Sequence, residues 1–167
     1  DGGKGADAYA DAIATYLAFN IDRCAGRWNH LSVWNNVRET LEHIFRLNAF
    51  QMTWVHAEGN PFSDSTGNWM GQVKWICKVL RRLPAAGDAE VLQSDAQHRV
   101  TECAPCVVST DPPYYDNVPY SDLADFFHVW LRKTVGEIWP DLMATIVTPK
   151  TEELVADNQR HGGKTEA

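Results

Sequence analysis

The segment Asp111-Pro112-Pro113-Tyr114 constrains this chain more than any other stretch. Consecutive prolines have no backbone N–H to donate and fix φ at about −65°, so regular hydrogen bonding has to stop there. The preceding residues, Cys106-Val107-Val108-Ser109, are apolar and β-branched, which predicts a short strand buried in a parallel sheet. Because open α/β sheets bind ligands at the carboxyl ends of their strands, we expect Asp111 to Tyr114 to line a binding site.

Apolar residues at spacings of three and four predict amphipathic helices on both sides of this segment. The predicted helices cover about residues 7–24, 36–47, 66–83 and 121–135. Gly26 is expected to end the first helix, Ser65 or Thr66 to cap the third, and Ser121 to cap the fourth. Further short strands are predicted at residues 90–93 and 144–147. The order of elements predicts an α/β fold with a helical portion at its N-terminal end.

The chemistry of the proline segment suits a planar ligand that bears an amino group. The prolines leave carbonyl oxygens free to accept hydrogen bonds, and Asp111 adds a carboxylate. Tyr114 supplies a flat ring for stacking. An extruded nucleobase with an exocyclic NH₂ group has the matching donors and the matching shape.

Composition limits the partners and the compartment. The 167 residues carry a net charge of −7 and show no basic tail, so charge gives no argument for nucleic-acid binding. No apolar run is long enough to span a bilayer, and no signal-peptide pattern is present, so we expect no membrane contact and a cytoplasmic location.

Cys24 and Cys77 are expected in the core, and His128 as a packed side chain. Cys103 and Cys106 have the spacing of half a zinc site only, and we expect no metal.

Asp111-Pro112-Pro113-Tyr114 resembles the (D/N/S)-P-P-(Y/F/W) motif of amino-methyltransferases, which use S-adenosylmethionine to methylate N6 of adenine or N4 of cytosine. Longer stretches resemble one family of large prokaryotic adenine-specific DNA methylases that begin with a domain of unknown function. These stretches are residues 109–117, 120–127, 129–132, 148–150, 152–155 and 160–164, with residues 9–12 and 60–62 in the front half.

The resemblance implies a partial Rossmann-like methyltransferase fold, with residues 1–65 as a helical portion and residues 66–167 as part of the α/β domain. It implies that Asp111 and the Pro112 carbonyl hold the target amino group and that Tyr114 stacks on the flipped base, with Pro113 completing the catalytic loop. Asp95 matches the acidic position that contacts the cofactor adenine. The Gly-rich loop of such enzymes (F-x-G-x-G) is absent, and the chain lacks an initiator Met. We therefore expect an internal fragment of an adenine-N6 DNA methyltransferase, with DNA bound through the parent protein and little cofactor binding by the fragment alone.

Other interpretations stay open. The chain is alternatively a non-catalytic nucleic-acid-binding or interaction module that retained a methyltransferase-like fold. A third possibility is a methyltransferase for RNA or for a protein amide. At the level of single residues, Asp95 also suits a helix or turn cap, and the segment from Asp111 to Tyr114 also suits a simple stiffened turn.

Overall fold

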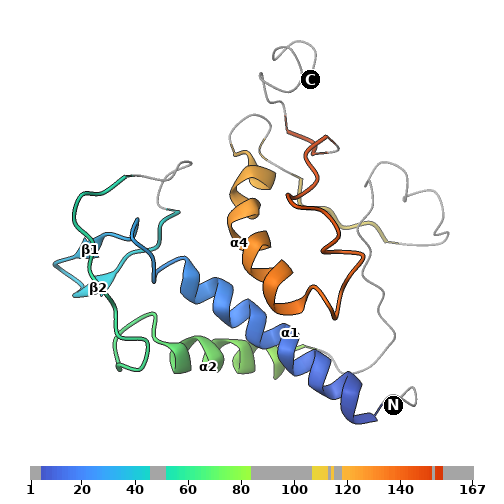
Figure 1. Ribbon diagram of the computed structural model, residues 1–167, viewed down its shortest axis with the longest axis horizontal. Helices are drawn as coiled ribbons and strands as arrows, with labels where there is room; N and C mark the ends of the chain where they lie inside the picture. The colour runs from blue at the N-terminus through green and yellow to red at the C-terminus, as the bar shows by residue number, and fades with distance from the viewer. Residues whose placement is uncertain are drawn as a thin grey trace.

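The computed structural model describes residues 5–45, 52–83, 107–112, 114, 118–151 and 153–155. Its elements are the helices α1 (Gly5–Ala25), α2 (Trp69–Leu80) and α4 (Tyr120–Val135), and the strands β1 (Trp34–Asn35) and β2 (Thr40–Leu41) (Figure 1). None of the described helices combines the length and the apolar character needed to cross a membrane.

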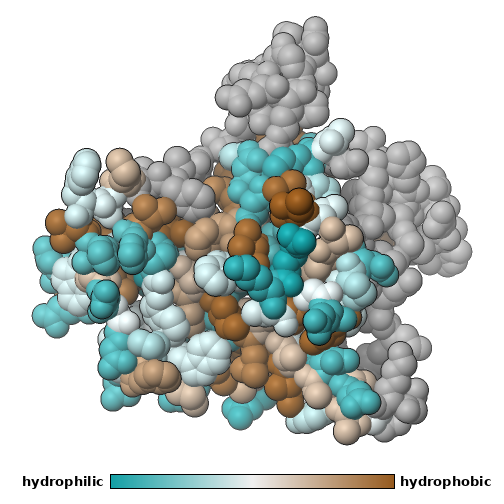
Figure 2. Space-filling view, viewed as in Figure 1, coloured by the Kyte–Doolittle hydropathy of each residue, from teal (hydrophilic) through white to brown (hydrophobic). Residues whose placement is uncertain are grey.

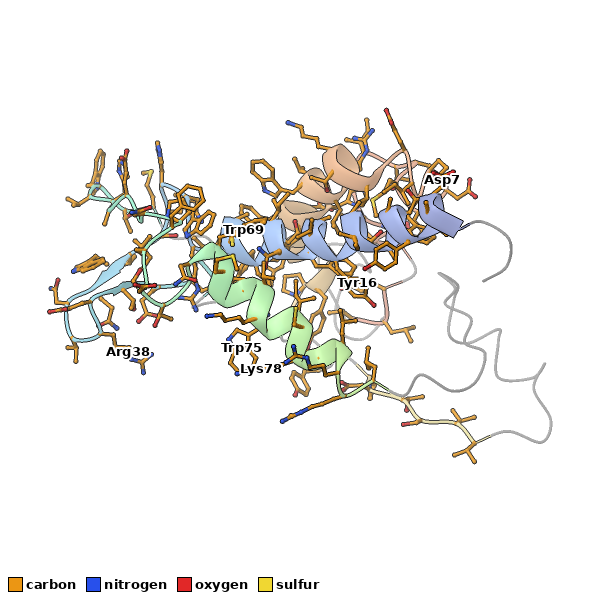
Figure 3. All side chains as sticks on the ribbon, turned by 90° about the horizontal axis from the view of Figure 1, so that it is seen from below. Asp7, Tyr16, Arg38, Trp69, Trp75 and Lys78 are labelled. Atoms are coloured by element: carbon orange, nitrogen blue, oxygen red, sulfur yellow. The ribbon has the colours of Figure 1, made fainter. Side chains whose placement is uncertain are left out.

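Helix α1 lies between the other two helices and packs against both (Figures 1 and 3). Ala18 and Cys24 are buried on it, as the sequence predicts for Cys24. Two side-chain hydrogen bonds fix its neighbours: Arg23 Nε donates to Gln72 Oε1 of α2 at 2.8 Å, and Trp139 Nε1 donates to Thr15 Oγ1 at 2.9 Å. Hydrophobic side chains of α1 also reach the surface, as Figure 2 shows, and Ile13 and Leu17 are among them.

The limits of α1 agree with the predicted helix over residues 7–24. Asp7 in the first turn and Arg23 in the last turn complement the helix dipole. The helix ends before Gly26, where a Cβ atom would lie 2.2 Å from His43 Nε2. A side chain at this position would therefore require the His43 ring to move.

The predicted helix over residues 36–47 is wrong in its described part, because β1 and β2 form an antiparallel hairpin there. Trp34 pairs with Leu41, and Asn35 pairs with Thr40. The Asn35 side-chain oxygen accepts hydrogen bonds from the N–H groups of Val37 and Arg38 at 2.9 and 3.0 Å. Short polar side chains compete with helical hydrogen bonding in this way and favour a turn.

The predicted fold class is also wrong: within the described residues the only sheet is this two-stranded antiparallel one, and no parallel sheet of a Rossmann-like fold is formed. Residues 107–109 and 144–147 are not strands. Val107 is 97 % exposed and Ile146 is 76 % exposed, so neither segment is buried between layers. Strand propensity depends on partners and on burial, and these β-branched residues have neither. The predicted strand at residues 90–93 lies outside the described residues.

Helices α2 and α4 confirm the helices predicted at about residues 66–83 and 121–135, although each begins at a different residue from the one predicted. Asn68 caps α2, accepting a hydrogen bond from Gly71 N–H, so the expected caps Ser65 and Thr66 are wrong. Cys77 is exposed on α2, contrary to the prediction of a core thiol. On α4, His128 is buried as predicted, and its Nε2 donates to the Thr145 carbonyl at 3.0 Å.

Candidate functional site

An open pocket of about 430 Å³ lies at the N-terminal end of α4. Its walls come from three separate parts of the chain. The residues that line it are Asp111, Pro112, Tyr114, Tyr120, Glu153 and Leu154. Three of the four predicted catalytic residues therefore share one pocket, and the fourth, Pro113, lies outside the described residues.

The motif side chains in this pocket face solvent. Asp111 and Pro112 are exposed, and Tyr114 is 69 % exposed. Tyr120, the first residue of α4, adds a second half-exposed aromatic ring. The pocket thus presents a carboxylate and aromatic surface to any ligand that enters it.

Glu153 holds the wall of the pocket to the start of α4. Its Oε1 accepts a hydrogen bond from the Ser121 N–H at 2.8 Å, and its Oε2 accepts one from Ser121 Oγ at 2.5 Å. The residue at the N-cap position is Pro119, which makes no side-chain capping bond. Helix N-termini have unpaired N–H groups and a partial positive charge, and both favour a carboxylate. Glu153 therefore acts as the cap that was expected of Ser121, from 32 positions farther along the chain.

A second set of bonds fixes the same segment one turn farther along α4. Asp125 Oδ1 accepts hydrogen bonds from Thr148 N–H at 2.8 Å and Thr148 Oγ1 at 2.7 Å. Its Oδ2 lies 2.7 Å from Lys150 Nζ, which also approaches Asp122 at 3.3 Å. Desolvation opposes ionisation of Asp125, but these bonds outweigh it and lower the pKa of its carboxyl to about 2. Thr148, Lys150 and Glu153 are therefore held to α4 by charged hydrogen bonds.

Sequence reasoning assigned no site role to Tyr120, Glu153 or Leu154. A signal for Glu153 was present, because Pro119 before a predicted helix cannot cap it with a side-chain oxygen. A distant acceptor was therefore needed, although the sequence alone does not say which one. Tyr120 and Leu154 carry no comparable signal.

The cofactor and metal predictions fall largely on other parts of the chain. Asp95, Cys103 and Cys106 lie outside the described residues. Across the described ranges, no three His, Cys, Asp or Glu side chains come together in a way that would hold a metal ion.

Asp111 and Pro112 do not follow a buried strand, so the predicted position of this site at the carboxyl end of a parallel sheet is wrong. The pocket still brings Asp111, Pro112 and Tyr114 together. Comparison of the chain with protein-family models, with characterised proteins and with solved structures finds no match in any of the three.

Proposed function

We propose that this chain supplies the target-base pocket of an S-adenosylmethionine-dependent DNA amino-methyltransferase acting on N6 of adenine, within a longer protein. The observation that supports the proposal is the shared pocket of Asp111, Pro112 and Tyr114. Its acceptors and its ring match an exocyclic amino group on a planar base. The resemblance of the motif to amino-methyltransferases gives the reaction class.

Each motif residue has a separate task in this proposal. An exocyclic NH₂ group is a poor nucleophile because its lone pair is delocalised into the ring. Hydrogen bonds from this group to the Asp111 carboxylate and the Pro112 carbonyl favour the nitrogen geometry of the transition state over that of the ground state. Tyr114 stacks on the base and fixes the direction of the amino group. S-adenosylmethionine, when bound by the longer protein, supplies the methyl group.

The first test is Asp111→Ala in the longer protein, measured as transfer of labelled methyl groups to DNA. Loss of one preorganised electrostatic contact is expected to lower the rate by about 10²–10³. Asp64→Ala is the matched control, because Asp64 is also an exposed aspartate in a loop but lies outside the pocket. Equal rates for Asp111→Ala and the parent would contradict the proposal.

The same assay separates the alternative functions. Transfer of the labelled methyl group to RNA or to protein, and not to DNA, would favour the alternative of an RNA or protein methyltransferase. DNA binding that persists while no label is transferred, with the cofactor present in excess, would favour a non-catalytic module. Adenine and cytosine are distinguished by hydrolysing the labelled DNA and identifying the methylated base.

A further inference from the structure

The side of α2 opposite the buried residue Gln72 carries a row of cations. Lys74, Lys78, Arg81 and Arg82 are spaced at i, i+4, i+7 and i+8, so they share one side of the helix and its C-terminal extension. All four side chains are exposed. Residues 69–83 contain no Asp or Glu, although the whole chain has a net charge of −7. This row, here called the α2 cation row, is therefore a local positive surface on an acidic protein.

These cations do not serve the packing of α2. The opposite side of the helix faces α1 and carries the buried residue Gln72, which bonds to Arg23. Within the described residues, none of the four cations forms an ion pair. Four neighbouring like charges repel one another unless an anion neutralises them.

Trp75 adds an aromatic surface to the α2 cation row. Its side chain is 55 % exposed, and Lys78 Nζ lies 4.5 Å from the ring centroid. Figure 3 shows Trp75 and Lys78 pointing away from α1. An exposed tryptophan among lysines combines the two features by which proteins bind single-stranded nucleic acid: cations that follow the phosphates and a ring on which a base stacks.

We infer that the α2 cation row binds a single-stranded or locally unpaired segment of DNA, with the cations on the phosphates and Trp75 stacked on a base. The inference deepens the proposed function and rests on it for the choice of DNA, because a chain that holds an extruded base needs further contacts to the strand. The repeated phosphate charges complement the spacing of the cations, and the aromatic ring favours a nucleic acid over an acidic protein.

The test uses the complete 167-residue chain and a fluorescent oligothymidine of about 15 nucleotides, a length within the usual site size. Anisotropy titrations at several salt concentrations give the affinity and its salt dependence. Lys78→Glu is expected to weaken binding at least about tenfold and to reduce the slope of log K against log salt by about 0.7 or more. Trp75→Ala is expected to weaken binding about fivefold or more, and Trp75→Phe to retain most of it.

Lys133→Glu is the matched control. Lys133 also lies in the last turn of a helix, α4, and its Nζ is 6.0 Å from the Trp130 ring centroid. The substitution changes the net charge equally, so a binding change within about twofold is expected. Equal losses for Lys78→Glu and Lys133→Glu would overturn the inference, because they would show a general charge effect.

Two further outcomes are decisive. No detectable binding by the unaltered chain overturns the inference, and so does equal affinity for polyglutamate, which has phosphate-like charge but no bases. Circular dichroism of each variant separates a lost surface from a lost fold, and the Lys78→Glu variant keeps the test valid if Trp75→Ala unfolds. The two proposals fail in different experiments: the pocket proposal fails if Asp111→Ala in the longer protein transfers methyl groups at the parent rate, and the α2 cation row fails if the unaltered chain does not bind the oligothymidine.

Discussion

The aspartates Asp22, near the end of α1, and Asp125, on α4, lie in different surroundings and have pKa values shifted in opposite directions. Asp125 accepts hydrogen bonds from Thr148 and Lys150, and its pKa is lowered to about 2. Asp22 is buried, its Oδ1 has no hydrogen-bond partner, and desolvation raises its pKa to about 7. Burial of Asp22 without a hydrogen-bond partner for its Oδ1 therefore raises its pKa. Hydrogen bonds that outweigh desolvation lower the pKa of Asp125 instead.

The contrast extends to the neighbours of each aspartate. Around Asp125, long-range hydrogen bonds connect α4 to Thr148 and Lys150. Around the end of α1, Asn20 and Ser32 are fully buried and their side-chain polar atoms are also unpaired. The first region uses its polar groups to join distant segments, whereas the second loses stability by burying them. The difference shows that the same polar residue types stabilise or destabilise according to whether a partner reaches them.

The largest expected effect comes from Asp22→Asn, which removes the buried charge. A carboxyl whose folded pKa is raised contributes stability that is complete below its unfolded value of 3.8 and is lost as pH rises through about 7. The substitution is expected to raise the free energy of unfolding at pH 8 by about 2 kcal/mol and to flatten its pH dependence between about pH 4 and 7. Urea unfolding at several pH values measures both. An unchanged pH profile would contradict the raised pKa.

Asp125→Ala is expected to have the opposite sign and a smaller size. It removes the shared acceptor for Thr148 and Lys150 and is expected to cost about 1–2 kcal/mol at pH 7. In the parent chain this stability is present above pH 3.8 and is lost as pH falls through about 2, so the variant is expected to lose that acid dependence. Asp122→Ala is the comparison: Asp122 Oδ1 lies 3.3 Å from Lys150 Nζ and its side chain is more exposed than that of Asp125, so we expect a smaller loss. An Asp122 loss equal to the Asp125 loss would show that the network has no central acceptor.

The smallest expected effect comes from Ser32→Ala. Ser32 Oγ is buried and unpaired, so its removal relieves a desolvation cost. We expect a gain of about 0.5–1 kcal/mol in the free energy of unfolding, measured by thermal denaturation. Ser65→Ala, in an exposed loop, is the matched control and is expected to change stability by less than about 0.5 kcal/mol. A loss of stability in Ser32→Ala would mean that the hydroxyl has a partner that stabilises it.

The helices were predictable from sequence because their signals are local. The three-to-four spacing of apolar residues located α1, α2 and α4 to within a few residues. The same spacing failed at residues 36–45, because the Asn35 side chain takes the N–H groups of Val37 and Arg38 and starts a turn. Periodicity does not report such competition between a side chain and the backbone.

The outcome at the predicted strand before Asp111 was not predictable from sequence, because strand formation depends on partners that can be far away in sequence. Val107 and Val108 have strong β propensity, yet both are exposed and no strand pairs with them in the described residues. At the site, the sequence located Asp111, Pro112 and Tyr114 but not Glu153, whose role depends on a contact across 32 positions. The roles of Asp95 and Pro113, and the domain boundary at residue 65, stay predictions.

The bond between Glu153 and Ser121 links ligand affinity to the position of the chain that follows Thr148. Because Glu153 and Leu154 form part of the pocket, the complete binding surface exists only while that segment is docked on α4. The apparent affinity for a ligand of this pocket then equals the intrinsic affinity multiplied by the docked fraction. By the same linkage, a bound ligand holds the segment in place. A protein or modification that releases Glu153 from Ser121 would therefore weaken ligand binding in this pocket without touching Asp111 or Tyr114.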